Sequence, residues 1–382
     1  MGEPRTVQPV GADERILALD VLRGFAMFGV LIAYCLWSLG NAPDGQWSPL
    51  DRRLGTLAEF LIDGKFYTIL AFLFGLGFAI QLNRAPTDAI AVRAYCRRLV
   101  ALAAIGLGHA LLLRNGDILL PYAVTGFFLI PFRRAPDRLL VGAAVVALLV
   151  PYAARWLLAT AGIALPERPH LENAPYLVEN AAWVLYWYKT AILTWPTNLT
   201  LFLFGFLAGR HRLIRRLAPQ PRALAAILAG GATVGVTFYA VSSMSSGSAA
   251  LPTLAFTLHC WGMSSAYAAT LLLLLRSTAG SRAIMPLAAI GRMALTNYLS
   301  QAAIIVPLCL TLGWFDRFTP STALLLAGAV FVFIQLPFSL LWLRRFRFGP
   351  AEWVWRSLTY WQRQPMRSEA ASVSPSAPQI SS

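Results

Sequence analysis

Long apolar blocks recur along this chain of 382 residues, and each is close to the ~20 residues with which an α-helix crosses the ~30 Å hydrocarbon core of a bilayer. Hydrophobic residues make up 57% of the chain and charged residues only 13%, about half of the charged share usual in a soluble domain. The sequence therefore predicts an all-α, polytopic integral membrane bundle of about ten transmembrane helices. The predicted spans lie at 16–38, 65–82, 98–113, 117–132, 138–160, 190–208, 222–242, 252–275, 284–311 and 321–343.

Four segments are less regular than the other blocks. The blocks 98–113 and 117–132 are short, and they form either two full spans or one re-entrant hairpin. The stretches 175–189 and 349–361 mix aromatic with polar residues. Because aromatic side chains favour headgroup depth, we expect interfacial helices in these two stretches.

Arginine clusters separate the apolar blocks in alternate loops, whereas the intervening loops are acidic, mixed or neutral. The net charge of +15 would favour nucleic acid in a soluble chain, but this alternation is the positive-inside pattern of membrane proteins. We therefore expect no nucleic-acid partner and both chain ends in the cytoplasm. The chain then divides into a cytoplasmic N-terminal segment, 1–14, a membrane domain, 15–365, and a disordered cytoplasmic tail, 366–382.

The four cysteines lie far apart in or beside apolar blocks, without the spacing of metal ligands or of a disulfide framework. We expect them to pack as small hydrophobic residues, and no metal site is predicted. The chain has no P-loop, dinucleotide-binding fingerprint, nucleophile elbow or HExxH motif. Candidate functional residues must therefore be sought among the isolated polar residues of the spans.

The first span carries Asp20 and Arg23 a few residues after its start. An Arg at mid-helix costs roughly 2.5–3.5 kcal/mol on insertion scales, although near a helix end its long stem reaches the headgroups. Asp20 and Arg23 lie three residues apart on one helix face and can pair. The alternative is an inward-facing anion site, to which Gly24 would allow close approach of a helix or a ligand.

A second polar group interrupts the predicted span 284–311, where "IGRMALTNYLSQ" places Arg292 and Asn297 in apolar sequence. The topology puts Arg292 in the cytoplasmic leaflet, at a depth like that of Arg23. Either both cations contact lipid headgroups separately, or they bind one shared anionic partner. Lipid phosphate is one alternative for the identity of that partner. We favour the shared partner. The predicted binding residues are Arg23, Gly24, Arg292 and Asn297.

The opposite side of the membrane has another polar set. Lys65 opens the second predicted span, and His109 lies in the outer half of the third span, followed by Asp117. At similar depth these residues would supply a cation, a general base and an orienting carboxylate, so we predict all three as catalytic. The competitor is His259 in the eighth predicted span, and a lone His in a membrane helix is often an interhelical hydrogen-bond partner.

Five ordered motifs between about residues 15 and 365 carry a family resemblance: "LDVLRGFAMFGVL", "DGKFYTILAFLFGLG", "GDILLPYAVTG", "GRMALTNYLSQ" and "RFRFGPAEWVWRSLTY". Together they resemble the YeiB-type bacterial membrane proteins, a family with a domain of unknown function that is grouped with the transmembrane acyltransferase superfamily. The resemblance implies a helical core in the bacterial inner membrane that receives acyl-CoA from the cytoplasm. In the sugar O-acetyltransferases of that superfamily, a functional His follows the Arg-Gly pair of the first span by eleven residues, where this chain has Tyr34. The base must then lie elsewhere, and His109 is our choice.

Three functions stay open from the sequence. In an acyltransferase, Arg23 and Arg292 would hold the phosphates of acetyl-CoA or another acyl-CoA, and His109 would take a proton from the acceptor. In a transporter or flippase of a small anionic or lipid-like substrate, the same charges would line its path, and in a non-catalytic component they would serve helix packing. Cations on one side and a His, Asp and Lys set on the other favour the acyltransferase, because transporter sites lie near the midplane. The expected partners are membrane lipid and a small-molecule or glycan acceptor, and a homo-oligomer stays open.

Overall fold

The computed structural model describes residues 17–39, 47–83, 87–113, 116–167, 169, 175–244, 250–314 and 317–367. Within these ranges the regular elements are helices, and the one β feature is an isolated antiparallel bridge between Phe346 and Arg367. The predicted N-terminal segment 1–14 and the tail from 368 onward lie outside the described residues. The apolar blocks therefore predicted the fold class of the described chain correctly.

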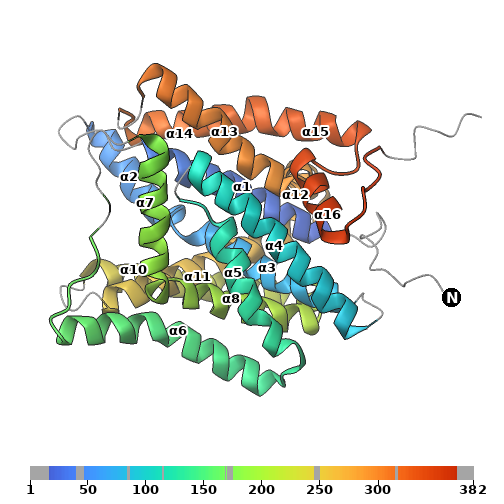
Figure 1. The fold of residues 1–382 in the computed structure, drawn as a ribbon, viewed down its shortest axis with the longest axis horizontal. Coiled ribbons are helices and arrows are strands. Elements are labelled where there is room, and N and C mark those ends of the chain that lie inside the picture. Colours follow the sequence, from blue (N-terminus) through green and yellow to red (C-terminus); the bar gives the residue numbers. More distant parts are fainter. Residues whose placement is uncertain are drawn as a thin grey trace, which may run out of the picture.

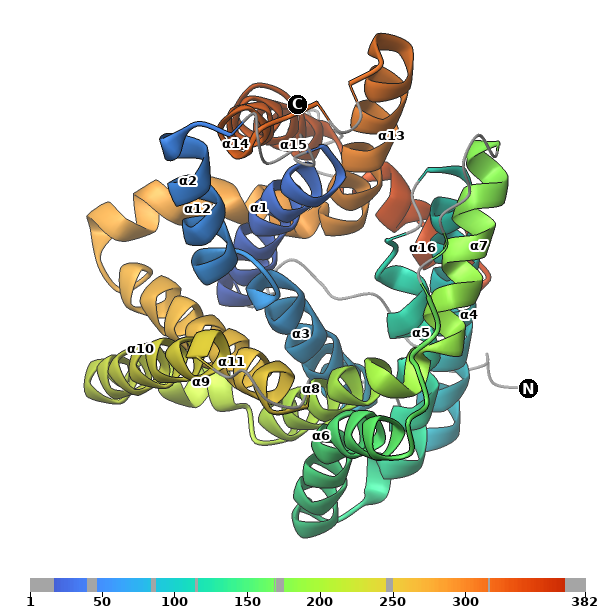
Figure 2. The ribbon, with the colours of Figure 1, turned by 90° about the vertical axis from the view of Figure 1, so that its left-hand side faces the viewer.

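The helices surround a central helix, α3. Figure 2 shows α10 and α11 on one side of α3. On the other side of α3 lie α4, α5 and α7, and α13 to α15 lie beyond α1. Figure 1 gives the same chain from a view turned by 90°. The elements are α1 (Leu17–Leu39), α2 (Pro49–Leu61), α3 (Lys65–Leu82), α4 (Asp88–Leu112), α5 (Leu119–Leu129), η3 (Ile130–Arg134), α6 (Asp137–Thr160), α7 (Tyr176–Lys189), η4 (Ala191–Leu193), α8 (Trp195–Arg210), α9 (Leu213–Leu217), α10 (Pro221–Met244), α11 (Ala250–Leu274), α12 (Thr278–Arg292), α13 (Ala294–Leu312), α14 (Pro320–Ala329), the π-helix η5 (Val330–Gln335), α15 (Leu336–Arg345) and α16 (Pro350–Tyr360). The two predicted interfacial stretches form the short helices α7 and α16.

Several of these helices have the length and apolarity of membrane spans. Among the described residues, six segments qualify, and the pair α11 and α12 adds a seventh if it is counted as one span bent by 118°. The six are Leu17–Trp37, Pro49–Leu82, Asp137–Thr160, Pro221–Met244, Ala294–Leu312 and Pro320–Arg345. The chain is therefore a membrane protein, although fewer segments meet this criterion than the ten blocks of the sequence prediction.

Helix α4 begins earlier than the predicted span 98–113. It starts at Asp88, because the side chain of Thr87 accepts a hydrogen bond from the backbone N–H of Ile90 and so caps the first turn. With 25 residues, α4 is about 37 Å long, enough to cross a bilayer, whereas α5 has only 11 residues. Helix α4 therefore has the length of a span, although it is not among the six segments of the described chain that qualify as spans.

The predicted span 284–311 is wrong as a single helix. Helix α12 ends at Arg292 and α13 begins at Ala294, with Met293 at the break between them. The free backbone groups at the break are satisfied from other parts of the chain: Asn297 Nδ2 donates to the carbonyl of Met293 (3.0 Å), and Glu352 of α16 accepts from the N–H of Leu295 (2.6 Å). Because these backbone groups are paired within the protein, the break is tolerated in apolar surroundings.

Pairs of helices cross with their backbones almost in contact, at glycines contributed by both partners. A Cβ atom on Gly24 of α1 would lie 1.9 Å from the carbonyl oxygen of Leu287, and one on Gly291 of α12 would lie 1.8 Å from the carbonyl oxygen of Asp20. Similar crossings join α3 to α8 at Gly75 and Gly205, and α10 to α11 at Gly231 and Gly262. Small residues allow this approach, which drives helix association in lipid. The α1–α12 crossing also sets Asp20 and Arg23 beside the end of α12.

Candidate functional site

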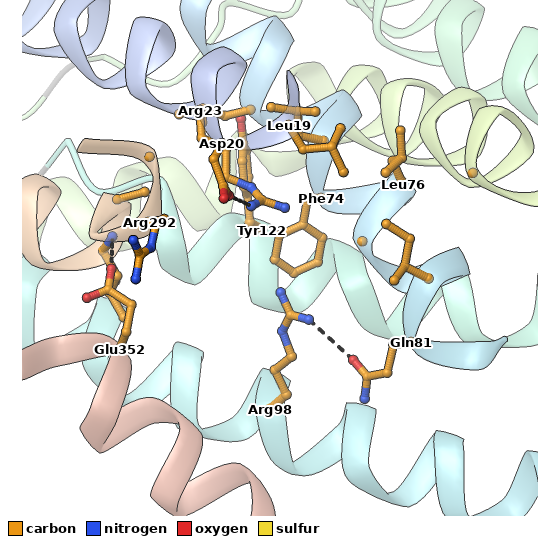
Figure 3. Close-up of a pocket in the computed structure, with 18 of the residues that line it drawn as sticks. Leu19, Asp20, Arg23, Phe74, Leu76, Gln81, Arg98, Tyr122, Arg292 and Glu352 are labelled. Carbon is orange, nitrogen blue, oxygen red and sulfur yellow. Dashed lines mark hydrogen bonds and ion pairs between the residues drawn. The ribbon is translucent and has the colours of Figure 1, made fainter. Parts of the chain in front are cut away.

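A cavity of about 780 Å³ lies among α1, α3, α4, α5, α8, α9, α12, α13 and α16. This volume falls in the range of ~300–1,000 Å³ that is typical of small-molecule sites. Its wall carries an excess of positive charge, and Figure 3 shows part of it. The charged residues of the wall are Asp20, Arg23, Arg98, Arg212, Arg215, Arg292, Glu352 and Arg356.

Arg23 and Arg292, which the sequence predicted to share one anionic partner, both line this cavity. Arg23 Nη1 lies 2.9 Å from Asp20 Oδ1, so the pair predicted within the first span forms. The same carboxylate lies within electrostatic range of Arg292. Arg292 Nε is buried and has no hydrogen-bond partner in the described part of the chain. The two arginines therefore line the same cavity.

Arg98 is a third arginine of the wall that the sequence prediction missed. Figure 3 shows its guanidinium group directed from α4 into the space that Arg23 faces. Its Nη1 donates to Gln81 Oε1 at 3.3 Å, its Cζ lies 4.5 Å from the centre of the Trp355 ring, and its buried Nε has no partner within the described ranges. The sequence pattern placed Arg98 at the very start of the predicted span 98–113, beside an arginine-rich loop. Thr87 is the N-cap signal that would have placed Arg98 well inside a longer helix.

Two predicted binding residues serve helix packing instead of the cavity. Gly24 forms the crossing with α12, and Asn297 is buried, with Nδ2 donating to Ser339 Oγ at 3.0 Å as well as to the α12–α13 break. Neither belongs to the cavity wall formed by the described residues. The sequence motif identified the correct region, but it did not show which of its side chains reach the cavity.

His109 and Asp117, predicted as base and orienting carboxylate, lie together. His109 Nδ1 is 3.0 Å from Asp117 Oδ1, and the two side chains are only 2% and 3% exposed. Asp117 Oδ2 also accepts from the backbone N–H of Leu120 at 2.7 Å, which fixes the carboxylate at the start of α5. His109 Nε2 is buried without a hydrogen-bond partner among the described residues. His109 Nδ1 likewise forms no hydrogen bond with a described residue, and His109 is not part of the cavity wall that the described residues form.

Tyr298 connects the His109–Asp117 pair to the cavity. It lines the cavity wall, and its hydroxyl donates to Asp117 Oδ1 at 3.2 Å. Its ring also packs against the imidazole of His109, with 4.8 Å between ring centres. Sequence reasoning missed Tyr298, since it is separated from Asp117 by 181 positions along the chain.

Lys65 does not join His109. Its side chain is fully buried, its Nζ donates to the carbonyl of Glu59 at 2.5 Å, and it lies 5.1 Å from the centre of the Phe256 ring. The first turn of α3 faces α11, where Ser264 Oγ donates to the carbonyl of Lys65 at 2.8 Å. Across the described chain, no contact links Lys65 with His109, so the predicted group of three is split.

His259 packs as an interhelical residue. Its Nδ1 lies 2.7 Å from the carbonyl oxygen of Gly235 on α10, and its ring packs against Phe60 and Tyr239. Within the described residues there is no group of three or more His, Cys, Asp or Glu side chains that could hold a metal ion.

Glu352 is the buried carboxylate of the cavity wall. Its Oε1 accepts from the backbone N–H groups of Leu295 (2.6 Å) and Thr296 (3.1 Å), and its Oε2 accepts from the Thr296 hydroxyl at 2.5 Å. Burial raises the pKa of the Glu352 carboxyl, and it outweighs these hydrogen bonds, which lower it.

Sequence comparison with known proteins finds relatives that match more than nine-tenths of the chain. The family model described as "Protein of unknown function (DUF418)" matches residues 208–362, from the end of α8 through α16. "Uncharacterized protein YxaH" of Bacillus subtilis (strain 168) is 31% identical over 94% of this chain and 98% of its own. A protein of Bacillus acidopullulyticus, "Uncharacterized 39.9 kDa protein in amylase 3'region", is 30% identical over 94% of this chain and 98% of its own.

A third relative is "Uncharacterized protein YeiB" of Escherichia coli (strain K12), which is 30% identical over 91% of this chain and 96% of its own. No solved structure matches the chain significantly. The similarity to these proteins covers nearly every described helix, including those of the cavity and of the His109–Asp117 pair. The chain therefore belongs to the YeiB-like DUF418 family.

Proposed function

We propose that this protein is a membrane-embedded acyltransferase, which moves an acyl group, with acetyl expected, from cytoplasmic acyl-CoA to an acceptor on the outer side of the bacterial inner membrane. One observation carries the proposal: an arginine-rich cavity reaches Tyr298, which contacts the His109–Asp117 pair. Acyl transfer requires that the groups that bind the phosphates of the donor lie close to the general base. In this orientation both chain ends are cytoplasmic.

The arginines of the cavity suit a phosphate-bearing donor. Guanidinium groups bind phosphate through parallel N–H donors, and Arg98 and Arg292 each have a buried Nε without a partner in the described chain. Charge interactions are also stronger in a partly buried cavity than in water. Because α1, α4 and α12 each contribute one of Arg23, Arg98 and Arg292, the phosphates would be held from three sides.

The proposed chemistry uses His109 Nε2 as the base. It takes the proton of the acceptor hydroxyl or amine while the acceptor atom bonds to the thioester carbonyl carbon. The carbon–sulfur bond then breaks, and the coenzyme A thiolate receives the proton from His109. In this proposal neutral His109 carries its proton on Nδ1, the nitrogen that lies 3.0 Å from Asp117 Oδ1, so that Nε2 is the acceptor. The acceptor would be a small molecule or a glycan.

Transport is the second candidate, and the broken helix favours it. Discontinuous helices form the substrate sites of many secondary transporters, and here α12 and α13 are interrupted beside the cavity. In those transporters a free helix N-terminus faces the anion. The N-terminus of α13 is instead occupied by Glu352, which weakens this reading.

The proposal is tested by measuring acetyl-CoA binding to the purified full chain in detergent with titration calorimetry. We expect Arg23→Ala combined with Arg292→Ala to weaken binding by about tenfold or more, since charged hydrogen bonds to phosphate are lost. Arg282→Ala is the matched control, because Arg282 is exposed on α12.

Labelled acetyl-CoA supplied to one face of proteoliposomes then separates the two functions. Covalent label on an acceptor at the other face supports transfer. Uptake of an unmodified anion, with no binding of acetyl-CoA, would establish transport instead.

A further inference from the structure

Helix α16 contacts two of the elements that carry the arginines of the cavity. Glu352 and Trp355 lie one turn apart, so both side chains leave the same face of α16. Glu352 reaches the α12–α13 break next to Arg292, and Trp355 reaches α4 at Arg98. Both residues also line the cavity.

At the α12–α13 break, Glu352 of α16 caps the N-terminus of α13. The first N–H groups of α13 lack partners within their own helix, and the carboxylate of Glu352 accepts two of them, from Leu295 and Thr296. The Thr296 hydroxyl in turn accepts from the backbone N–H of Ala351 at 3.1 Å, so α16 and α13 hold each other. Arg292 ends α12 directly before this junction, and the junction therefore sets the direction in which its side chain leaves the backbone.

The contact with α4 holds Arg98 at both ends of the residue. Trp355 Nε1 donates to the carbonyl of Arg98 at 2.9 Å, and the indole ring lies 4.5 Å from the Arg98 Cζ. A guanidinium group over an aromatic face is attracted by the ring. Trp355 therefore fixes the backbone of Arg98 and the plane of its side chain together.

The start of α16 is built for this close approach. Gly349 precedes Pro350, which opens the helix, and a Cβ atom on Gly349 would lie 2.3 Å from Glu352 Oε2 and 2.6 Å from Thr296 Oγ1. Only a residue without a side chain leaves room for the Glu352–Thr296 contact at this point.

We infer that α16 positions the anion site: Glu352 orients Arg292, and Trp355 orients Arg98. This inference rests on the anion-binding part of the proposed function and not on acyl transfer. The two residues are positioning residues, because they act through the arginines and not on the bound anion. Glu352 gives the sharper test, since it is itself acidic. Removing a carboxylate from a cavity that binds an anion should tighten binding or leave it unchanged, whereas loss of a positioning contact should weaken binding.

The test measures inorganic pyrophosphate binding to the purified full chain by titration calorimetry. We expect Glu352→Ala to weaken binding by about tenfold, because a displaced arginine loses part of its contact with the anion. Glu352→Gln keeps an oxygen that accepts from Leu295 and Thr296, and it should restore binding to near that of the unaltered chain. Val354→Ala is the control on the exposed side of α16 and should change nothing.

A double-substitution cycle with Arg292→Ala distinguishes positioning from general damage. If Glu352 acts through Arg292, Glu352→Ala should have little further effect once Arg292 is gone. Tighter or unchanged binding in Glu352→Ala, full additivity in the cycle, or no pyrophosphate binding by the unaltered chain would each overturn the inference. If pyrophosphate binds and acetyl-CoA does not, the proposed donor is wrong while the positioning role of α16 stands.

Discussion

The hydroxyl of Tyr298 donates a hydrogen bond to Asp117 Oδ1 across 3.2 Å and accepts one from the backbone N–H of Ile118 at 3.1 Å. The carboxylate that faces His109 is therefore held by a side chain of the cavity wall. A ligand that contacts Tyr298 would also act on the orientation of His109. Donor binding and base orientation then depend on one side chain.

His109→Ala should lower acetyl transfer by about 10²–10⁴-fold, because the general base is lost. Binding of acetyl-CoA should stay within about twofold, since His109 is not part of the cavity wall that the described residues form. The measurement is labelled acetyl transfer in vesicles, run beside donor binding. His259→Ala is the control. Unchanged transfer in His109→Ala would exclude this base, and lost donor binding would make His109 a structural residue.

Arg98→Ala should weaken acetyl-CoA binding by about 10- to 100-fold, the value of a charged hydrogen bond in a partly buried site. Arg97→Ala is the matched control, because its guanidinium group lies over the Trp361 ring and is not part of the cavity wall of the described chain. Calorimetry on both variants makes the comparison. Equal losses in the two variants would show a general effect of surface charge and contradict a specific role for Arg98.

Gly24→Ala should destabilise the protein by about 1–3 kcal/mol, since the added methyl group would overlap the backbone of α12. Thermal unfolding in detergent checks this. The control is Gly328→Ala on α14, where an added Cβ meets no atom within 4 Å. An unchanged unfolding midpoint in Gly24→Ala would mean that the backbones of α1 and α12 have room for the added methyl group, which contradicts a close crossing.

The pH dependence of stability should include a contribution from Glu352. Because burial raises the pKa of this carboxyl, the folded chain holds the proton more readily than the unfolded chain. The contribution of Glu352 to the free energy of unfolding is fully present below the unfolded pKa of about 4.3. It is lost as the pH rises through the pKa of the folded state. Glu352→Gln should remove this part of the slope in unfolding midpoints measured from about pH 4 upward. An identical slope in both proteins would assign the pH dependence to other groups.

A reporter inserted at Ile163, between α6 and α7, should lie outside the cell, and one at Gln220, before α10, should lie inside. The reason is the arginine cluster around Gln220, which the positive-inside rule retains in the cytoplasm. Reporter activity on each side of the membrane is the measurement. If both positions report the same side, the assignment of donor and acceptor sides fails.

The sequence predicted best the features that depend on local pattern. The length of the apolar blocks predicted the helices, and His109 and Asp117 lie together as expected because few residues separate the end of α4 from the start of α5. For Lys65 the sequence predicted only a depth in the membrane, and depth does not specify which neighbouring helix a side chain faces. Lys65 faces α11 for that reason without violating any sequence pattern.

The features that the sequence did not predict depend on distant partners. The break at Met293 is stable because Glu352, on a helix far along the chain, caps α13. The hydropathy pattern does not reveal the break, since apolar residues lie on both sides of the Arg292–Met293 step. Arg98 was missed for a related reason: an arginine near the end of an apolar block has the same sequence signature in a loop and in a cavity wall.

The last described helix has a consequence for biogenesis. Ribosomes synthesise the chain from the N-terminus to the C-terminus. Helix α1, with Asp20 and Arg23, therefore enters the membrane long before Glu352 and Trp355 of α16 have been synthesised. A nascent chain that ends before α16 would contain all six span-like segments and still lack the cap on α13 and the indole beneath Arg98. Under the proposed role of α16, membrane insertion and anion binding are separate events in the life of the chain, and anion binding requires that α16 has been synthesised.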